Sequence, residues 1–222
     1  MASTVIQSPQ FSTLILTLVL LLPSPSLSSD PDPLQDFCIA DLQGRISVNG
    51  FPCKPASNVT SDDFFFGGLA REGNTNNSFG SSVIQGNVLA FPGLNTLGIS
   101  MNRLDIAPGG IIPPHSHPRA TESGIVIQGQ LLVGLITTSG VFYAKNLIAG
   151  QMFVIPRGLL HFQLNVGNEK ALIYSAFNSH MPGSVYVSVT LFGSRPSVPN
   201  DVLKKAFLVN ESVIDQIKSK FG

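Results

Sequence analysis

Residues 109–122 read GGIIPPHSHPRATE and residues 150–165 read GQMFVIPRGLLHFQLN, so the two segments together hold three histidines and a glutamate. His115 and His117 are two residues apart, and in a strand their side chains point to the same face. Glu122 follows after a short connection and can reach the same point from an adjoining strand. His161 must arrive from a separate strand. A closed barrel allows this convergence, because its strands share one interior.

These four side chains predict a metal site. Burying three imidazoles and a carboxylate costs free energy unless they are hydrogen-bonded or coordinated, and a cation offsets that cost. The alternative is that the histidines are surface loop residues beside the neighbouring prolines. Three imidazoles and one carboxylate suit Mn, Fe, Zn, Cu or Ni, so residue chemistry alone leaves the metal open.

Strand-forming segments dominate the chain after the Gly-, Asn- and Ser-rich stretch 67–82, which is expected to be a surface loop. Runs rich in Val, Ile, Leu and Phe predict strands at 97–106, 124–136, 141–148, 151–155, 170–177 and 184–192. They indicate one all-β domain, a sandwich or small barrel. Helical spacing of apolar residues is found at 200–207 and 210–221. It predicts short C-terminal helices that cover a barrel end or pack on another subunit.

The N-terminus resembles a targeting segment. Residues 14–22 are almost wholly apolar and a Pro/Ser segment follows at 23–29, which predicts a secretory signal peptide at 1–28 and a mature domain at 29–222. The apolar run is too short to span a membrane.

The 13 basic and 13 acidic residues balance, which argues against a nucleic-acid or anionic-membrane surface. The sequence contains no Gly-rich phosphate loop and no Gly-x-Ser-x-Gly motif, so nucleotide-binding and hydrolase functions are not supported.

Export makes the two cysteines informative, because an isolated pair in an oxidising compartment usually forms a disulfide. We expect Cys38 to bond Cys53, which restricts the unfolded chain by about 3 kcal/mol in the entropic description. Two buried free thiols are the alternative.

Sequons begin at Asn58, Asn76 and Asn210, and each could carry a glycan if exposed. Asn210 has a competing role as the N-cap of the last helix.

The two segments of the candidate metal site resemble the two boxes of germins and germin-like proteins, which are members of the cupin superfamily. The resemblance extends to DPDPLQDFC at 30–38, NTLGISMNR at 95–103 and LFGS at 191–194, and so covers essentially the whole mature chain. It implies a single cupin jelly-roll β-barrel that binds Mn²⁺ through the residues matching His115, His117, Glu122 and His161. It also implies a homohexamer, a trimer of dimers clasped by the C-terminal helices, in the plant extracellular space, the apoplast and cell wall.

The resemblance also bears on the substrate. Asn102 matches an asparagine that lies beside the metal in oxalate-oxidising germins and helps to bind substrate, although a structural asparagine at a strand end is equally consistent with the residue alone. Those enzymes carry a second such asparagine where this chain has Ile112. An isoleucine removes a donor and an acceptor for an oxalate carboxylate and narrows the pocket.

Three functions follow from these observations. We expect a secreted, glycosylated manganese protein with superoxide dismutase activity that produces hydrogen peroxide, with a role in defence or wall modification. Oxalate oxidase is the second hypothesis, favoured by Asn102. The third is a wall-associated structural or binding protein that uses the metal for stability and binds a small apolar acid such as an auxin. Gln163 and Asn165 are candidates to orient His161 through hydrogen bonds, with packing in the strand as the alternative. Arg119 is expected to be a structural or solvated charge, and His180 a loop histidine.

Overall fold

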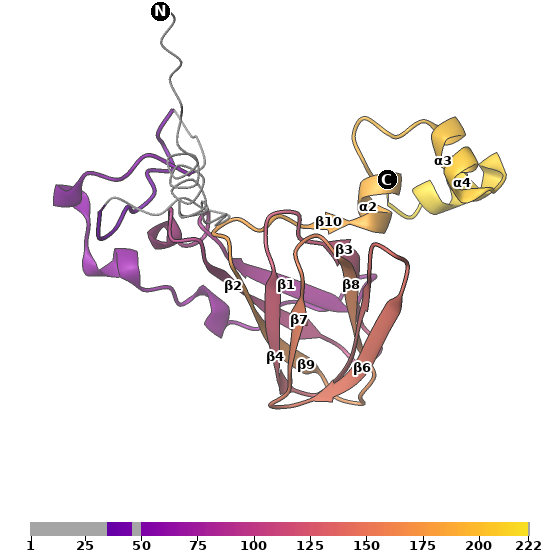
Figure 1. Cartoon of the computed structure of the whole chain (residues 1–222), viewed down its shortest axis with the longest axis horizontal. Helices are drawn as coiled ribbons and strands as arrows, with labels where there is room; N and C mark the ends of the chain where they lie inside the picture. The colour runs from indigo at the N-terminus through magenta and orange to yellow at the C-terminus, as the bar shows by residue number, and fades with distance from the viewer. Residues whose placement is uncertain (1–34, 46–49, 222) are drawn as a thin grey trace, which may run out of the picture.

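The computed structural model describes residues 35–45 and 50–221, so the signal peptide expected at 1–28 lies outside the described residues. Within these ranges two five-stranded antiparallel sheets face each other as a jelly-roll barrel (Figure 1). The predicted all-β fold with short C-terminal helices is confirmed. In chain order the strands are β1 (Ser81–Gly86), β2 (Ser100–Ile106), β3 (Ile111–Ser116), β4 (Glu122–Gln128), β5 (Gln130–Ile136), β6 (Phe142–Ile148), β7 (Met152–Ile155), β8 (Leu160–Asn165), β9 (Ala171–Phe177) and β10 (Val185–Tyr186).

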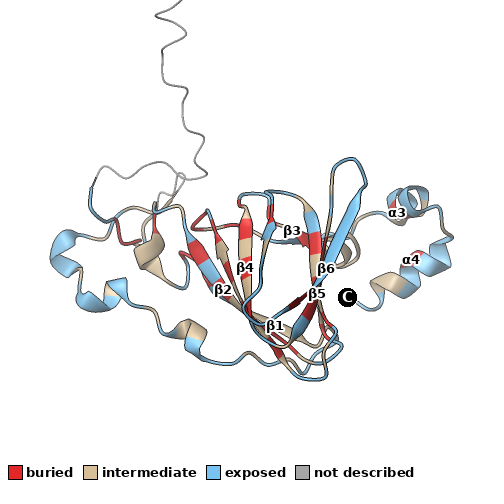
Figure 2. Cartoon of the chain, turned by 60° about the horizontal axis from the view of Figure 1, so that its bottom comes forward, coloured by how far each residue is buried: buried red, intermediate tan, exposed pale blue. Residues whose placement is uncertain are grey.

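The order of the strands brings distant parts of the sequence together. One sheet has the order β1-β2-β9-β4-β7 and the other β10-β3-β8-β5-β6. Alternate residues of each strand point between the sheets, and their buried apolar side chains make one core, as the buried positions in Figure 2 show. Members of that core from both sheets include Ile106, Ile112, Val126, Leu131 and Ile173.

Two of the predicted strand segments are wrong in detail. The run 124–136 is divided between β4 and β5, because Gly129 takes a positive φ of 85° in the turn between them. The run 184–192 is a strand only at Val185 and Tyr186, which pair with Ser116 and His115 of β3. The residues that follow form the helix α2 (Val187–Phe192), where their backbone groups bond within the helix despite the β-branched side chains.

A bulge in β3 determines which of its side chains face the core. Ile112 pairs with Gln163 and His115 pairs with His161, so three residue steps on β3 oppose two on β8. In a regular strand Ile112 and His115 would point to opposite faces. The extra residue, at Pro113-Pro114, brings both side chains into the barrel interior, where Ile112 is 1% and His115 3% exposed.

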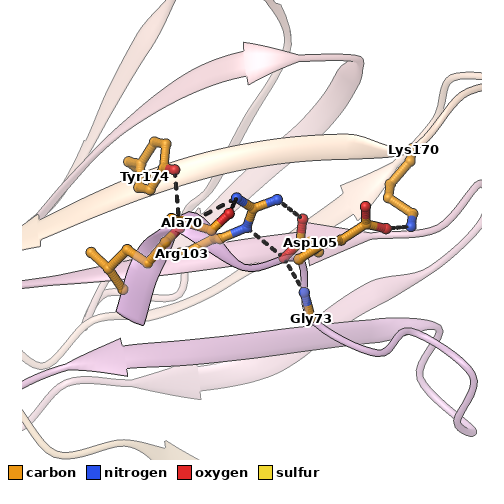
Figure 3. A network of polar contacts seen from close by, with 8 residues as sticks. Ala70, Gly73, Arg103, Asp105, Lys170 and Tyr174 are labelled. Carbon is orange, nitrogen blue, oxygen red and sulfur yellow. Dashed lines mark hydrogen bonds and ion pairs between the residues drawn. The ribbon is translucent and has the colours of Figure 1, made fainter. Parts of the chain in front are cut away.

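The expected surface loop 67–82 lies against the outer face of the first sheet, and β1 begins within it at Ser81. A polar network attaches the loop (Figure 3). Both carboxylate oxygens of Asp105 accept bonds from the Arg103 guanidinium at 2.8 Å, and Oδ2 also accepts the Gly73 backbone N–H at 2.8 Å. Lys170 pairs with Glu72 nearby. Asp105 is therefore buried although it stands on the outer side of β2.

The N-terminal loop is cross-linked as predicted. Cys38 and Cys53 form a disulfide with their Cα atoms 4.8 Å apart, which confirms the expected pairing. The side-chain amide of Asn95 donates to the Phe51 carbonyl at 2.8 Å and thereby ties the cross-linked segment to the residues that precede β2.

The C-terminal helices α3 (Asn200–Phe207) and α4 (Glu211–Lys218) lie to one side of the barrel (Figure 1). Each buries one apolar residue, Leu203 and Ile214, whereas Val202, Phe207 and Leu208 remain exposed. Asn210 occupies the N-cap position of α4 as expected, but its side chain makes no capping hydrogen bond. None of the helices in the described ranges has both the length and the apolar character needed to cross a membrane.

Candidate metal centre

The four predicted ligands converge inside the barrel. His115 lies near the end of β3, His117 directly after it, His161 on β8 and Glu122 at the start of β4. One ligand atom from each can be chosen so that all four lie within 4.8 Å of one another, and each residue is at most 4% exposed. The sequence placed Glu122 on an adjoining strand, but β4 belongs to the opposite sheet, so the carboxylate faces the histidines across the core.

The three imidazoles are oriented by backbone carbonyls. Nδ1 of His115 lies 2.9 Å from the Pro113 oxygen, Nδ1 of His117 2.6 Å from the Gly183 oxygen, and Nδ1 of His161 2.9 Å from the Leu159 oxygen. A carbonyl can only accept, so each Nδ1 carries the proton. In the neutral imidazole Nε2 then has its lone pair free, which is the arrangement that metal-binding histidines require.

The carboxylate of Glu122 completes a cluster of acceptor atoms. Its Oε2 lies 3.1 Å from Nε2 of His117 and 2.9 Å from Nε2 of His161. Nδ1 of both rings already carries a proton. The short contacts of Oε2 with the two Nε2 atoms therefore require that both Nε2 atoms are protonated as well, or that a cation lies among these acceptor atoms. Two buried imidazolium ions with ring centroids 5.3 Å apart would be costly. One divalent ion would replace both protons, so the donor set fits a metal.

The protonation states of the cluster agree with metal binding. Burial, reinforced by the neighbouring His161 and His117, lowers the pKa of His115 to about 3, so this imidazole is neutral at physiological pH. Burial acts to raise the pKa of Glu122, but hydrogen bonds with His117 and His161 outweigh it and hold that pKa well below its ordinary value. Ligands must be neutral imidazoles and an ionised carboxylate, and His115 and Glu122 meet that condition.

A very small cavity is lined by three of the four ligands, His115, His117 and Glu122. It has about 10 Å³ of free space, which is roughly the room for one water molecule. Asn102 and Ile112 both line it, as the sequence predicted. Within the described residues the side-chain oxygen of Asn102 is buried without a hydrogen-bond partner. A buried acceptor beside the cavity is available to a guest molecule.

Gln163 and Asn165, the two residues proposed to orient His161, make no hydrogen bond with its ring in the part of the chain that the structure describes. Asn165 donates to the carbonyls of Ile106 and Glu169 and accepts from Gly167 N–H, so it stabilises the turn after β8. Gln163 is fully buried, and within the described chain both polar atoms of its side chain lack a partner. The orienting contact of His161 is instead the Leu159 carbonyl.

Other residues singled out in the sequence lie away from the cluster. Arg119 donates to the Met181 carbonyl at 2.7 Å, which is a structural contact. His180 is buried, and its Nδ1 accepts the Thr96 backbone N–H at 3.0 Å. The sequon residues Asn58, Asn76 and Asn210 are all exposed.

Sequence reasoning missed several residues that contact the ligands, among them Ser175 and Tyr186. Ser175 on β9 donates its hydroxyl to Oε1 of Glu122 at 2.6 Å and so orients the carboxylate. The ring of Tyr186 on β10 stacks on His115 with centroids 5.0 Å apart. The signal for Ser175 was a polar residue on the inward face of a strand otherwise lined by apolar residues. Tyr186 had no signal, because it lies in a run that predicted an ordinary strand.

The comparison with known proteins agrees with this geometry. The Cupin family matches residues 67–215. The chain is 56% identical over 198 residues to germin-like protein subfamily T member 2 of Arabidopsis thaliana, covering 89% of each protein. It is 53% identical to oxalate oxidase 2 of Hordeum vulgare over 92% of this chain and 93% of that protein.

A solved structure has the same fold over nearly its whole length. The oxalate oxidase determined in complex with the substrate analogue glycolate superposes with a TM-score of 0.85 at 52% identity, covering 87% of this chain and 98% of that one. The fold, the buried His/Glu cluster and these relatives lead to one conclusion. The chain belongs to the germin-like proteins of the cupin superfamily.

Proposed function

We propose that the protein is a manganese-dependent superoxide dismutase that releases hydrogen peroxide. His115, His117, Glu122 and His161 would bind the ion. The observation that carries the proposal is the confined space beside the ligands, a cavity of about 10 Å³ that is too small for a dicarboxylate and favours the smallest substrates. When bound, manganese would supply one-electron oxidation and reduction.

The residues around the ligands would select this substrate by size. Ile112, Leu104 and Phe177 line the cavity with apolar surface. They exclude bulk water, and the apolar side chain of Ile112 offers neither a donor nor an acceptor to a second carboxylate group. The unpartnered oxygen of Asn102 could accept a hydrogen bond from a protonated oxygen species such as the peroxide product.

Dismutation is tested by comparing the manganese-loaded protein with the same concentration of aqueous Mn²⁺ in a superoxide assay. We expect the loaded protein to exceed the free ion by at least about tenfold, because the site concentrates ion and substrate in one place. Glu122→Gln protein prepared in the same way is the matched control and should be no better than the free ion. Equal rates for the loaded protein and the free ion would refute the proposal.

Oxalate oxidation is the second candidate function, and the relatives named as oxalate oxidases together with Asn102 favour it. We expect the unaltered protein to release little peroxide from oxalate, and Ile112→Asn to raise that release by about tenfold or more, since the new amide adds a donor and an acceptor. Ile112→Val, which keeps the wall apolar, is the control. Full oxalate turnover by the unaltered protein would reverse the order of the two hypotheses.

A non-enzymatic role remains the third hypothesis, in which the metal stabilises a wall-associated protein that binds a small apolar acid. Loss of the folded oligomer on metal removal, with no turnover of superoxide or oxalate by the loaded form, would favour it.

We further propose that residues 29–222 form the mature protein and that it is secreted to the plant apoplast or cell wall, with a role in defence or wall modification. The disulfide and the three exposed sequon asparagines support export. The exposed apolar residues Val202 and Phe207 of α3 and Leu208 directly after it support a homo-oligomer, which we take to be a hexamer.

A further inference from the structure

A second and larger pocket adjoins the metal cavity. It measures about 360 Å³, against about 10 Å³ for the metal cavity by the same measure, and its walls come from β1, β3, β10 and α2. Val83, Ile112 and Tyr186 line both spaces. These three side chains therefore form the partition between an open outer pocket and the buried ligands.

The partition lies at a seam between the two sheets. β1 is the edge of one sheet and β10, next to β3, is the edge of the other. At one end the seam is closed, because Ile111 N–H donates to the Phe79 carbonyl at 2.8 Å and the Ser81 hydroxyl donates to the Ile111 carbonyl at 2.7 Å. At the level of Val83 and Tyr186 side chains separate the two spaces, so a molecule could pass there without breaking the ladders within either sheet.

Tyr186 is the member of the partition held by the shortest element. β10 contains only two residues and pairs with β3 alone. The Tyr186 ring covers His115, with an angle of 23° between the ring planes. Tyr186 lies at the junction of β10 and α2, so its ring can swing by rotation about its own side-chain bonds without breaking a strand, whereas Val83 and Ile112 stand within longer strands.

We propose that metal ions and small molecules reach the metal cavity through the outer pocket, and that the Tyr186 ring gates this passage. The route would admit an ion or a molecule of a few atoms and retard a dicarboxylate. The inference rests on the proposed metal site but not on dismutation, so it can be tested without turnover.

The first test fills the outer pocket without touching a ligand. Val189 on α2 lines that pocket and is 39% exposed. Co²⁺ entry into the full chain, first freed of metal by chelation, is followed by cobalt absorption in a stopped-flow instrument, and Co²⁺ release is followed with a chelator. We expect Val189→Trp to slow entry and release by a similar factor, about tenfold, and to leave the equilibrium Kd unchanged, because a gate alters neither end state.

Val141→Trp is the matched control, since Val141 is 44% exposed between β5 and β6 and does not line the pocket. It should bind Co²⁺ at the rate of the unaltered protein. An unchanged entry rate in Val189→Trp would overturn the proposed route. A weaker Kd with a faster release rate would point to damage at the ligands and would also overturn it.

The second test opens the partition. Tyr186→Ala is expected to speed Co²⁺ entry by about tenfold or more, while Tyr186→Phe, which keeps the ring, should enter at the original rate. Entry into Tyr186→Ala no faster than into the unaltered protein would overturn the gate. Failure of the unaltered, metal-free protein to bind Co²⁺ at all would refute the metal site itself and with it the route, a result distinct from a failure of the gate.

Discussion

Replacement of Glu122 by glutamine is expected to lower the affinity of the protein for its divalent metal by more than about 100-fold. Glutamine keeps the size of the side chain but removes the anionic ligand of the cluster. Glu122 is 1% exposed, so its charge is compensated by its neighbours and by the cation that we propose. Metal content after dialysis, measured by mass spectrometry, and the rise in Tm on adding metal both report the loss.

The metal-free protein separates a ligand role from a purely structural one. Without the ion, hydrogen bonds with His117 and His161 outweigh the cost of burial and hold the pKa of Glu122 below its ordinary value, so the ionised carboxylate stabilises the fold at neutral pH. Metal-free Glu122→Gln should therefore be less stable to urea than the unaltered metal-free protein, and the additional loss seen with metal bound is the contribution of the ligand. Glu72→Gln is the matched control, since Glu72 is half-exposed and pairs with Lys170 outside the barrel. It should retain full metal binding. Unaltered metal affinity in Glu122→Gln would contradict the assignment of this residue as a ligand.

Replacement of Asp105 by alanine is expected to lower the free energy of unfolding by about 3–5 kcal/mol, the cost typical of breaking a buried ion pair by removing one partner. The Asp105 side chain is 1% exposed and accepts three hydrogen bonds, two from Arg103 and one from the Gly73 backbone. Its loss leaves a guanidinium and a backbone N–H without their acceptor. Urea denaturation of the metal-free protein measures the change.

The double variant Arg103→Met with Asp105→Leu tests whether the stability lost in Asp105→Ala comes from leaving the Arg103 charge without its partner. Because neither charge remains, it should recover a large part of the stability lost in Asp105→Ala. Asp201→Ala is the control on the surface, where the Asp201 side chain is 92% exposed, and it should change stability little. Equal stability for Asp105→Ala and the control would show that the polar network does not attach the 67–82 loop.

The parts of the fold that could be predicted are those with local signals. The apolar periodicity at 200–207 matches α3, and the run 170–177 contains β9, because each pattern is complete within one element. The run 184–192 misled because its β-branched residues favour a strand. Beyond Tyr186 those residues pair with no strand, and the chain forms a helix. A local pattern carries no information about whether a partner strand is present.

The donor chemistry of the site is already present in the chain: the spacing of His115 and His117, the acid that follows and the distant His161 specify which donor atoms are available. How these side chains converge depends on the three-dimensional arrangement of the strands. It brought Glu122 from the opposite sheet, turned Ile112 inward through the β3 bulge and covered Asp105 with a distant loop. The physical reason is that donor chemistry belongs to each side chain, whereas convergence depends on which strands exchange hydrogen bonds, and those pairings join residues far apart in the chain.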